Sequence, residues 1–111
     1  MDLTPQIRFI SRAFMETKEY KELKKARSHY LKDNEFSEKV NELKGLKYDI
    51  YQAQLGAKKI DNKKKNDMLL RIDTLSKDPN LQQYLNIEVD FHNLVYNTFN
   101  KISQIVDSSL N

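Results

Sequence analysis

The sequence predicts an all-α protein, an antiparallel bundle of four or five helices of which two are long. Only two glycines and two prolines interrupt its 111 residues, whereas an all-β chain needs turn residues every ten or so positions. Hydrophobic residues make up 39% and charged residues 32% of the chain, a balance that suits a thin helical bundle, and such bundles often gain core by oligomerising. The length predicts a single helical domain over residues 1–111.

The first predicted helix begins at Thr4 and Pro5, because threonine caps helices and proline is tolerated at the first helical position. One side of this helix is apolar, with Ile7, Ile10 and Phe14. A second, strongly basic helix is predicted over 18–32 and is capped by Thr17. Its inward side consists of Tyr20, Leu23, Ala26, Tyr30 and Leu31.

A third, long helix is predicted over 35–55, after a cap at Asp33 or Asn34. Its apolar side begins with Phe36, Val40, Leu43, Leu46 and Ile50 and widens toward the C-terminal end through Tyr48, Tyr51 and Leu55. A widened apolar side requires two packing partners. Gly56 is expected to end this helix. Residues 57–66 have almost no apolar content, so they are expected to form a solvated basic turn.

A fourth helix is predicted over 67–77, and Asp78 with Pro79 opens the last helix, which runs to about Ser108. Twelve apolar residues of the last helix spread over roughly 220° of its circumference. At about 1.5 Å per residue this helix is also roughly 40 Å long. Because a surface helix buries a narrower stripe, we expect other helices of the chain and a partner subunit to cover it.

Several classes of chemistry find no support in the sequence. Without cysteine there are no disulfides, no thiolate catalysis and no cysteine-based metal sites. Neither His29 nor His92 has a second histidine at zinc-ligand spacing, and no glycine-rich phosphate loop or nucleophile motif occurs. We therefore expect no metal, no cofactor and no catalytic residue, and we expect that the protein is not an enzyme.

Glu88 and His92 are the polar residues inside the apolar arc of the last helix, and they stand four residues apart. A carboxylate in a helical core is costly unless it is paired. The two residues are therefore a candidate buried polar pair that fixes helix register or oligomer geometry. A general acid-base role is the alternative, although no third polar group accompanies the pair.

Two sets of residues are candidate binding surfaces. The candidate oligomer or partner interface consists of Phe36, Tyr48, Tyr51, Leu55, Phe91, Val95, Phe99 and Ile102. The candidate phosphate contacts are Lys58, Lys59, Lys63, Lys64 and Lys65, which together with the basic 18–32 helix support an alternative function as an RNA-binding accessory protein. Against that alternative, the lysine run contains no aromatic residue for base stacking, and Asp61 and Asp67 dilute its charge.

The order of these features resembles the YlbF/YmcA family of bacterial regulators. The resemblance rests on the segment 16–26, on Tyr30 to Asp33, on the long helix that ends at Gly56, on Asp78-Pro79-Asn80 and on the series Tyr84, Glu88 and Phe91. It extends from about Leu3 to Ile105. Glu88 falls where the family commonly has glutamate.

The resemblance implies an all-helical fold that forms dimers or higher oligomers in the cytoplasm of low-GC Gram-positive bacteria. It also implies an adaptor in competence, sporulation and biofilm control, with other regulator subunits and the nuclease RNase Y as partners in messenger-RNA maturation. Some relatives carry a cysteine-rich tail linked to an iron–sulfur cluster, and we expect no cluster on this cysteine-free sequence. No apolar run suits a membrane span or a signal peptide, so we expect a cytoplasmic protein with no membrane contact.

Overall fold

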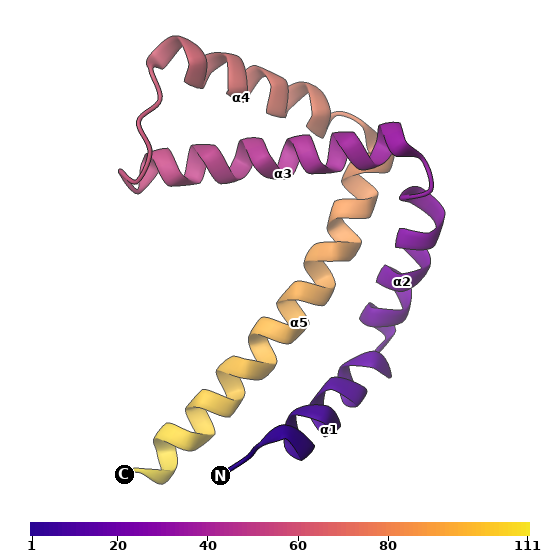
Figure 1. Cartoon of the computed structure of the whole chain (residues 1–111), viewed down its shortest axis with the longest axis vertical. Coiled ribbons are helices and arrows are strands. Elements are labelled where there is room, and N and C mark those ends of the chain that lie inside the picture. Colours follow the sequence, from indigo (N-terminus) through magenta and orange to yellow (C-terminus); the bar gives the residue numbers. More distant parts are fainter. The chain divides into compact units, whose positions relative to one another are not determined.

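The structure, a computed structural model, describes residues 1–111 and contains five α-helices and no strand (Figure 1). The helices are α1 (Thr4–Met15), α2 (Lys18–Tyr30), α3 (Asn34–Gln54), α4 (Asn62–Ser76) and α5 (Pro79–Ser109). The all-α prediction is thereby confirmed, whereas the antiparallel bundle, the oligomer and the single domain stay predictions. None of the helices combines the length and apolarity needed to cross a bilayer.

The chain divides into two compact units. Unit 1 consists of Met1–Ser28 with Asn86–Asn111, and unit 2 consists of His29–Leu85. Helices α2 and α5 each contribute residues to both units. Each unit has its own set of packed side chains.

Three of the predicted helix caps are confirmed. The Thr17 hydroxyl accepts a hydrogen bond from the backbone N–H of Tyr20 at 3.2 Å, just before α2. The Asp33 carboxylate accepts the N–H of Glu35 at 2.9 Å at the start of α3. The Asp78 carboxylate accepts the N–H of Asn80 at 3.0 Å at the start of α5. Short polar side chains thus satisfy backbone donors that the first helical turn leaves unpaired.

The predicted cap at Thr4 is wrong. Thr4 is the first residue of α1, Leu3 occupies the cap position, and Leu3 makes no side-chain cap bond. The Asp2 carboxylate instead accepts hydrogen bonds from the Thr4 hydroxyl and from the Thr4 backbone N–H. These hydrogen bonds lower the pKa of Asp2. An acidic residue two positions earlier therefore supplies the acceptor that threonine was expected to supply.

The expected solvated turn over 57–66 is too long at its C-terminal end. Helix α4 begins at Asn62 rather than at Asp67, because the Asp61 carboxylate caps it by accepting the N–H of Lys64 at 2.8 Å. Lysine is a good helix former, and a cap needs no apolar periodicity, so the pattern of apolar residues could not locate this start. At the other end of the turn, Gly56 has the positive φ of 76° that favours glycine after a helix.

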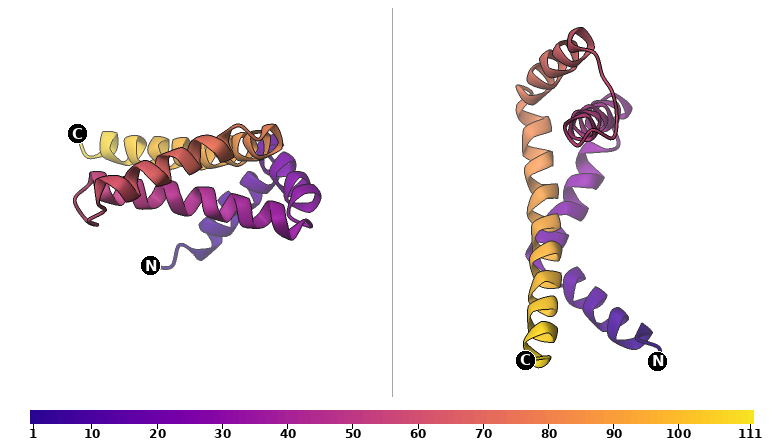
Figure 2. Two further views of the ribbon diagram at one scale, coloured as in Figure 1. Left: turned by 90° about the horizontal axis from the view of Figure 1, so that it is seen from above. Right: turned by 90° about the vertical axis from the view of Figure 1, so that its left-hand side faces the viewer.

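The core of unit 2 lies in the hairpin of α3 and α4 and at the first turns of α5. Helices α3 and α4 pack side by side, as two views of the ribbon show (Figures 1 and 2). Their buried side chains recur at helical spacings on the facing sides, with Val40, Leu43 and Ile50 from α3 and Met68 and Leu75 from α4. Helix α5 adds the fully buried Leu81 and Tyr84.

An aromatic cluster closes one end of unit 2. The rings of Tyr30 and Phe36 stack with centroids 5.0 Å apart. The ring of Tyr84 meets both of them edge-on, at 6.0 Å from Tyr30 and 5.9 Å from Phe36. Such geometries contribute about 0.5–1.5 kcal/mol per pair beyond the burial of the rings. The Tyr30 hydroxyl also donates to the Gln83 side-chain oxygen at 3.2 Å. Helices α2, α3 and α5 thus meet through three rings.

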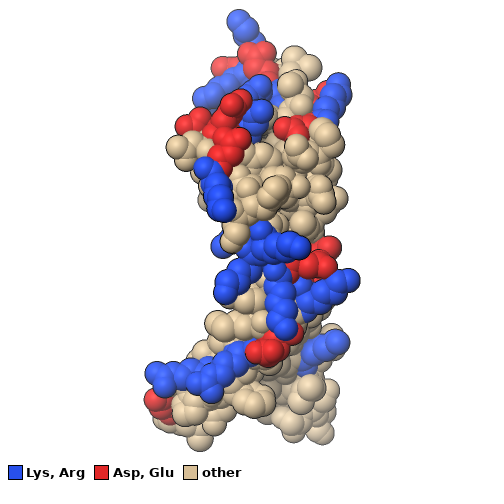
Figure 3. Space-filling model, turned by 90° about the vertical axis from the view of Figure 1, so that its right-hand side faces the viewer, with Lys and Arg blue, Asp and Glu red and all other residues tan.

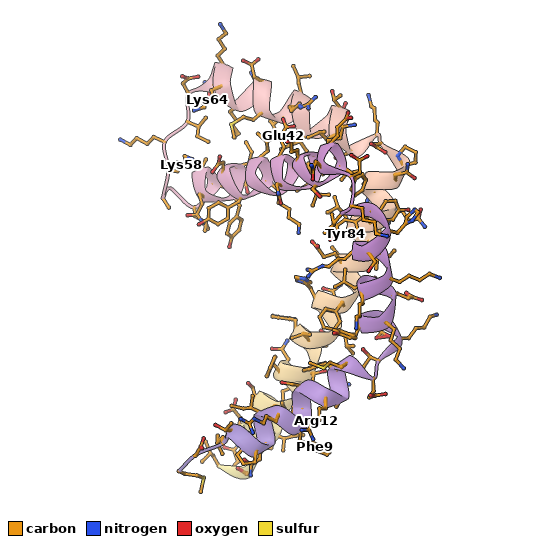
Figure 4. The ribbon with its side chains drawn as sticks, turned by 45° about the vertical axis from the view of Figure 1, so that its right-hand side comes forward. Phe9, Arg12, Glu42, Lys58, Lys64 and Tyr84 are labelled. Atoms are coloured by element: carbon orange, nitrogen blue, oxygen red, sulfur yellow. The ribbon has the colours of Figure 1, made fainter.

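A two-point ion pair joins α3 and α4. The Arg71 guanidinium donates to both carboxylate oxygens of Glu42, at 2.8 and 2.9 Å. Figure 4 shows Glu42 on the side of α3 nearest α4. Hydrogen bonding to Arg71 lowers the pKa of Glu42 below its ordinary value of 4.5. The contribution of this ion pair to the packing of α3 against α4 therefore depends on pH.

Removing the Glu42–Arg71 pair should make the free energy of unfolding less dependent on pH. A carboxyl whose pKa is lowered by folding stabilises the fold above its unfolded pKa and loses that contribution as the pH falls. Wild type should therefore exceed Arg71→Gln in free energy of unfolding at about pH 7, and the difference should shrink below about pH 4.5. Urea denaturation at about pH 7 and pH 3 measures it. If wild type and Arg71→Gln differed in free energy of unfolding by the same amount at both pH values, the ion pair would not have this stabilising role.

Unit 1 has a thin core. Its buried side chains are Leu23, Ala26 and Glu88. The Phe14 ring contacts Phe91 at 6.5 Å and Phe99 at 6.2 Å, and Tyr20 contacts Phe91 at 5.8 Å. Helices α1 and α2 thus touch α5 mainly through aromatic rings. The rest of the apolar surface of α1 and of the end of α5 is left uncovered.

Candidate functional site

Apolar side chains of unit 1 face solvent along α1 and along the C-terminal half of α5. No residue of α1 is buried. Ile7 is exposed although it lies on the apolar side of the helix, and Phe9 is 75% exposed. On α5 we define the α5 stripe as Phe99, Ile102, Ile105 and Val106, all of them exposed. These four recur at three- and four-residue spacing and therefore share one side of the helix. Figure 4 shows Phe9 and Arg12 on α1.

The structure divides the predicted interface residues into two groups. Five of the eight side chains are exposed, namely Tyr48, Tyr51, Leu55, Phe99 and Ile102. The other three, Phe36, Phe91 and Val95, are half-buried. Phe36 stacks on Tyr30, and Phe91 packs against Phe14 and Tyr20. Phe36 and Phe91 therefore serve the packing of their own units, which a helical wheel cannot distinguish from an intermolecular contact.

Sequence reasoning omitted several members of the exposed surface. Ile105 is 71% exposed, and Val106 and Ile7 are more than half exposed. The helical pattern already placed Ile105 and Val106 in the apolar arc of the last helix and Ile7 on the apolar side of the first. The signal was therefore present. What was missing is the knowledge of which apolar residues the remaining helices leave uncovered.

On the hairpin of unit 2, a second exposed set lies near the end of α3. Tyr48, Tyr51 and Leu55 are each more than half exposed, and we call them the hairpin patch. Tyrosine is enriched at protein interfaces because its ring buries a large area while its hydroxyl stays hydrated. The exposure of all three side chains supports this part of the predicted interface, which stays a prediction.

The predicted buried pair of Glu88 and His92 is wrong in its second member. Glu88 is buried, with 6% of its surface exposed, whereas His92 is exposed. One charge near Glu88 is Arg27 of α2, whose guanidinium lies 4.0 Å from the carboxylate. The four-residue spacing placed the two side chains on one side of α5. Glu88 is nevertheless shielded from solvent, with Arg27 of α2 nearby, whereas His92 is not shielded.

The five candidate phosphate contacts do not form one solvated turn. Lys58 donates to Asp49 at 3.0 Å, so its charge is partly compensated. Lys59 lies in the turn between α3 and α4, whereas Lys63, Lys64 and Lys65 belong to the first turn of α4. Figure 4 marks Lys58 and Lys64 in these two places. The described chain contains no group of three or more His, Asp or Glu side chains placed to hold a metal ion.

The sequence was compared with protein families, with curated proteins and with solved structures. A family model described as "Control of competence regulator ComK, YlbF/YmcA" matches residues 6–110, which is nearly the whole chain. No curated protein matches the chain. No solved structure matches it either. With an all-α fold and a match of this extent, the chain belongs to the YlbF/YmcA family of competence regulators.

Proposed function

We propose that this protein is a non-catalytic regulatory adaptor that acts by binding proteins, beginning with a second copy of itself. One observation carries the proposal. Every residue from Phe99 to Asn111 is exposed, and no residue of α1 is buried, although both segments carry large apolar side chains at helical spacing. Burying apolar surface yields roughly 25 cal/mol per Å². Monomeric proteins rarely leave a contiguous surface of this kind in water.

Charge favours a second copy as the occupant of this surface. Helix α1 carries Arg8 and Arg12 and no acidic residue. Helix α5 has three acidic residues, among them Asp90 and Asp107, and one basic residue, Lys101. Two copies related by a two-fold axis would place α1 of each against α5 of the other, so that each contact occurs twice. The same two helices, α1 and α5, then supply both the apolar area and the charge pairing.

If the protein self-associates, its mass in solution should exceed that of one chain, and substitutions in the α5 stripe should weaken the association. Light scattering after gel filtration should give at least twice the chain mass of 13.2 kDa at micromolar concentration. A carboxylate in the α5 stripe would be desolvated at the interface, so Phe99→Asp and Ile105→Asp should each raise the dissociation constant at least tenfold, which is about 1.4 kcal/mol. Sedimentation equilibrium measures this constant.

Two control variants separate the α5 stripe from a general effect of charge. Asn100→Asp adds the same charge to an exposed position next to the stripe and should leave the mass unchanged. Tyr51→Asp adds it to the hairpin patch and should also leave the mass unchanged. A strictly monomeric wild type would refute self-association. Loss of association in Tyr51→Asp alone would move the interface to the hairpin patch.

An adaptor needs a second surface that binds other proteins, and we assign this role to the hairpin patch. The family description names control of ComK as the regulated process. We propose that the partners are other subunits of such a regulatory complex, including a nuclease that processes RNA. In cells that lack the protein, Asn100→Asp should restore a competence reporter. Ile105→Asp and a Tyr48→Asp, Tyr51→Asp double variant should fail to restore it while the proteins accumulate normally.

A further inference from the structure

A groove of about 290 Å³ lies within unit 1 and is lined by residues of α2 and α5. We call its apolar and aromatic lining, formed by Tyr20, Leu23 and Phe91, the floor. The Tyr20 and Phe91 rings are inclined by 59° with centroids 5.8 Å apart, so the floor presents two ring surfaces rather than one flat stack. A groove of this size is close to the smaller end of small-molecule pockets, roughly 300–1,000 Å³.

The remaining lining of the same groove, which we call the rim, consists of hydrogen-bond donors. Lys24, Arg27 and Ser28 line it from α2, and His92 lines it from α5. The three α2 residues stand three and four positions apart, and Tyr20 lies four residues before Lys24, so one side of the helix presents them all. Figure 3 shows the face of the molecule on which Lys and Arg side chains gather over α2. An apolar floor and a cationic rim are thus combined in one place.

Glu88 lies beside Arg27 at this rim. Its buried carboxylate lies 4.0 Å from the Arg27 guanidinium, whose side chain is still 56% exposed. A guanidinium carries five N–H donors in a planar fork, so a single carboxylate on one side leaves donors for a ligand on the other. The ammonium group of Lys24 and the hydroxyl of Ser28 stand on the same side of α2. Such a set suits a phosphate, which accepts several charge-assisted hydrogen bonds at once.

We propose that this groove binds a nucleoside 5′-monophosphate, either free or as the 5′-terminal nucleotide of an RNA. Arg27 and Lys24 hold the phosphate, with Ser28 and His92 as additional donors. The base lies against the rings of Tyr20 and Phe91, and stacking of this kind contributes about 1–3 kcal/mol per base. The proposal concerns a ligand site and is independent of self-association.

The test titrates the full-length protein with AMP, UMP, adenosine and inorganic phosphate, followed by heteronuclear NMR. AMP and UMP should bind and shift the amide signals of residues 20–28 and 91–92. Adenosine lacks the phosphate and phosphate lacks the base, so each should bind at least tenfold more weakly. Equal affinity for AMP and inorganic phosphate would overturn the proposal, and so would the absence of binding at millimolar AMP.

Matched variants locate the site on α2. Lys24→Gln should weaken AMP binding at least fivefold. Lys25→Gln removes the same charge from the neighbouring position, which lines a different depression with Glu16 and Lys18, and it should bind AMP as wild type does. An equal loss in both variants would indicate diffuse attraction and overturn the site. Phe91→Leu, checked for folding by circular dichroism, should weaken AMP binding and leave the weak binding of phosphate unchanged.

Short oligoribonucleotides distinguish the two sources of the ligand. A tetranucleotide with a 5′-phosphate that binds at least as tightly as AMP, while its 5′-hydroxyl form does not, assigns the groove to RNA ends. Binding of AMP without binding of the 5′-phosphorylated tetranucleotide assigns it to free nucleotides. Equal binding of the two tetranucleotides would show that the terminal phosphate is not recognised and would overturn the proposal.

Discussion

Replacing Tyr84 with alanine should lower the free energy of unfolding by about 3–5 kcal/mol, the range for removing a large buried aromatic side chain. Tyr84 is 1% exposed, and its ring meets the edges of the Tyr30–Phe36 stack. The change therefore leaves a cavity and also removes two ring contacts. Since small domains are stable by only about 5–15 kcal/mol, the loss is a large fraction of the total. Urea denaturation followed by circular dichroism at a fixed protein concentration measures it.

Tyr96→Ala is the matched control for this measurement. Tyr96 lies on the same helix, α5, and is 65% exposed. An exposed substitution of this kind usually changes stability by less than about 0.5 kcal/mol. If Tyr84→Ala and Tyr96→Ala destabilised the protein equally, the aromatic cluster of unit 2 would not have the role assigned to it.

Replacing Leu43 with alanine should lower the free energy of unfolding by about 2–5 kcal/mol. Leu43 is 1% exposed in the middle of α3 and lies in the core that α3 and α4 form between them. The cost combines the lost transfer of the side chain from water with the cavity that remains. Thermal and urea denaturation should both report the loss.

Leu70→Ala removes the same side chain from the opposite helix of the hairpin. Leu70 is 67% exposed on α4, so this variant should lose less than about 0.5 kcal/mol. Similar losses in both variants would contradict the orientation of α4 in the hairpin.

The helices were predictable because their signals are local. Periodic apolar residues and the caps at Thr17, Asp33 and Asp78 depend on neighbours within a few positions of the chain. The start of α4 was missed because its first turn contains lysines and no apolar periodicity, so that only the Asp61 cap marked it. The displaced cap at the start of α1 shows that one further acceptor, Asp2, is enough to change a helix end.

The candidate site was less predictable because burial depends on contacts between distant segments. The apolar arc of α5 contains Tyr84, which is buried, and Ile105, which is exposed, and the two look alike on a helical wheel. Glu88 and His92 show the same limit, since one is covered and the other is not. Arg27, one of the charges near Glu88, is 61 positions away from it in the sequence. No spacing rule connects the two residues.

The first turn of α4 combines the N-terminal end of a helix with three consecutive lysines. The N-terminal end of a helix carries a partial positive charge, and Lys63, Lys64 and Lys65 add three like charges to it. Only the Asp61 cap offsets this repulsion among the residues before the helix. Fraying of α4 should therefore start at this end and stop before Met68, the first buried residue of the helix. Such fraying would lengthen the linker between α3 and α4 while the hairpin core stays closed.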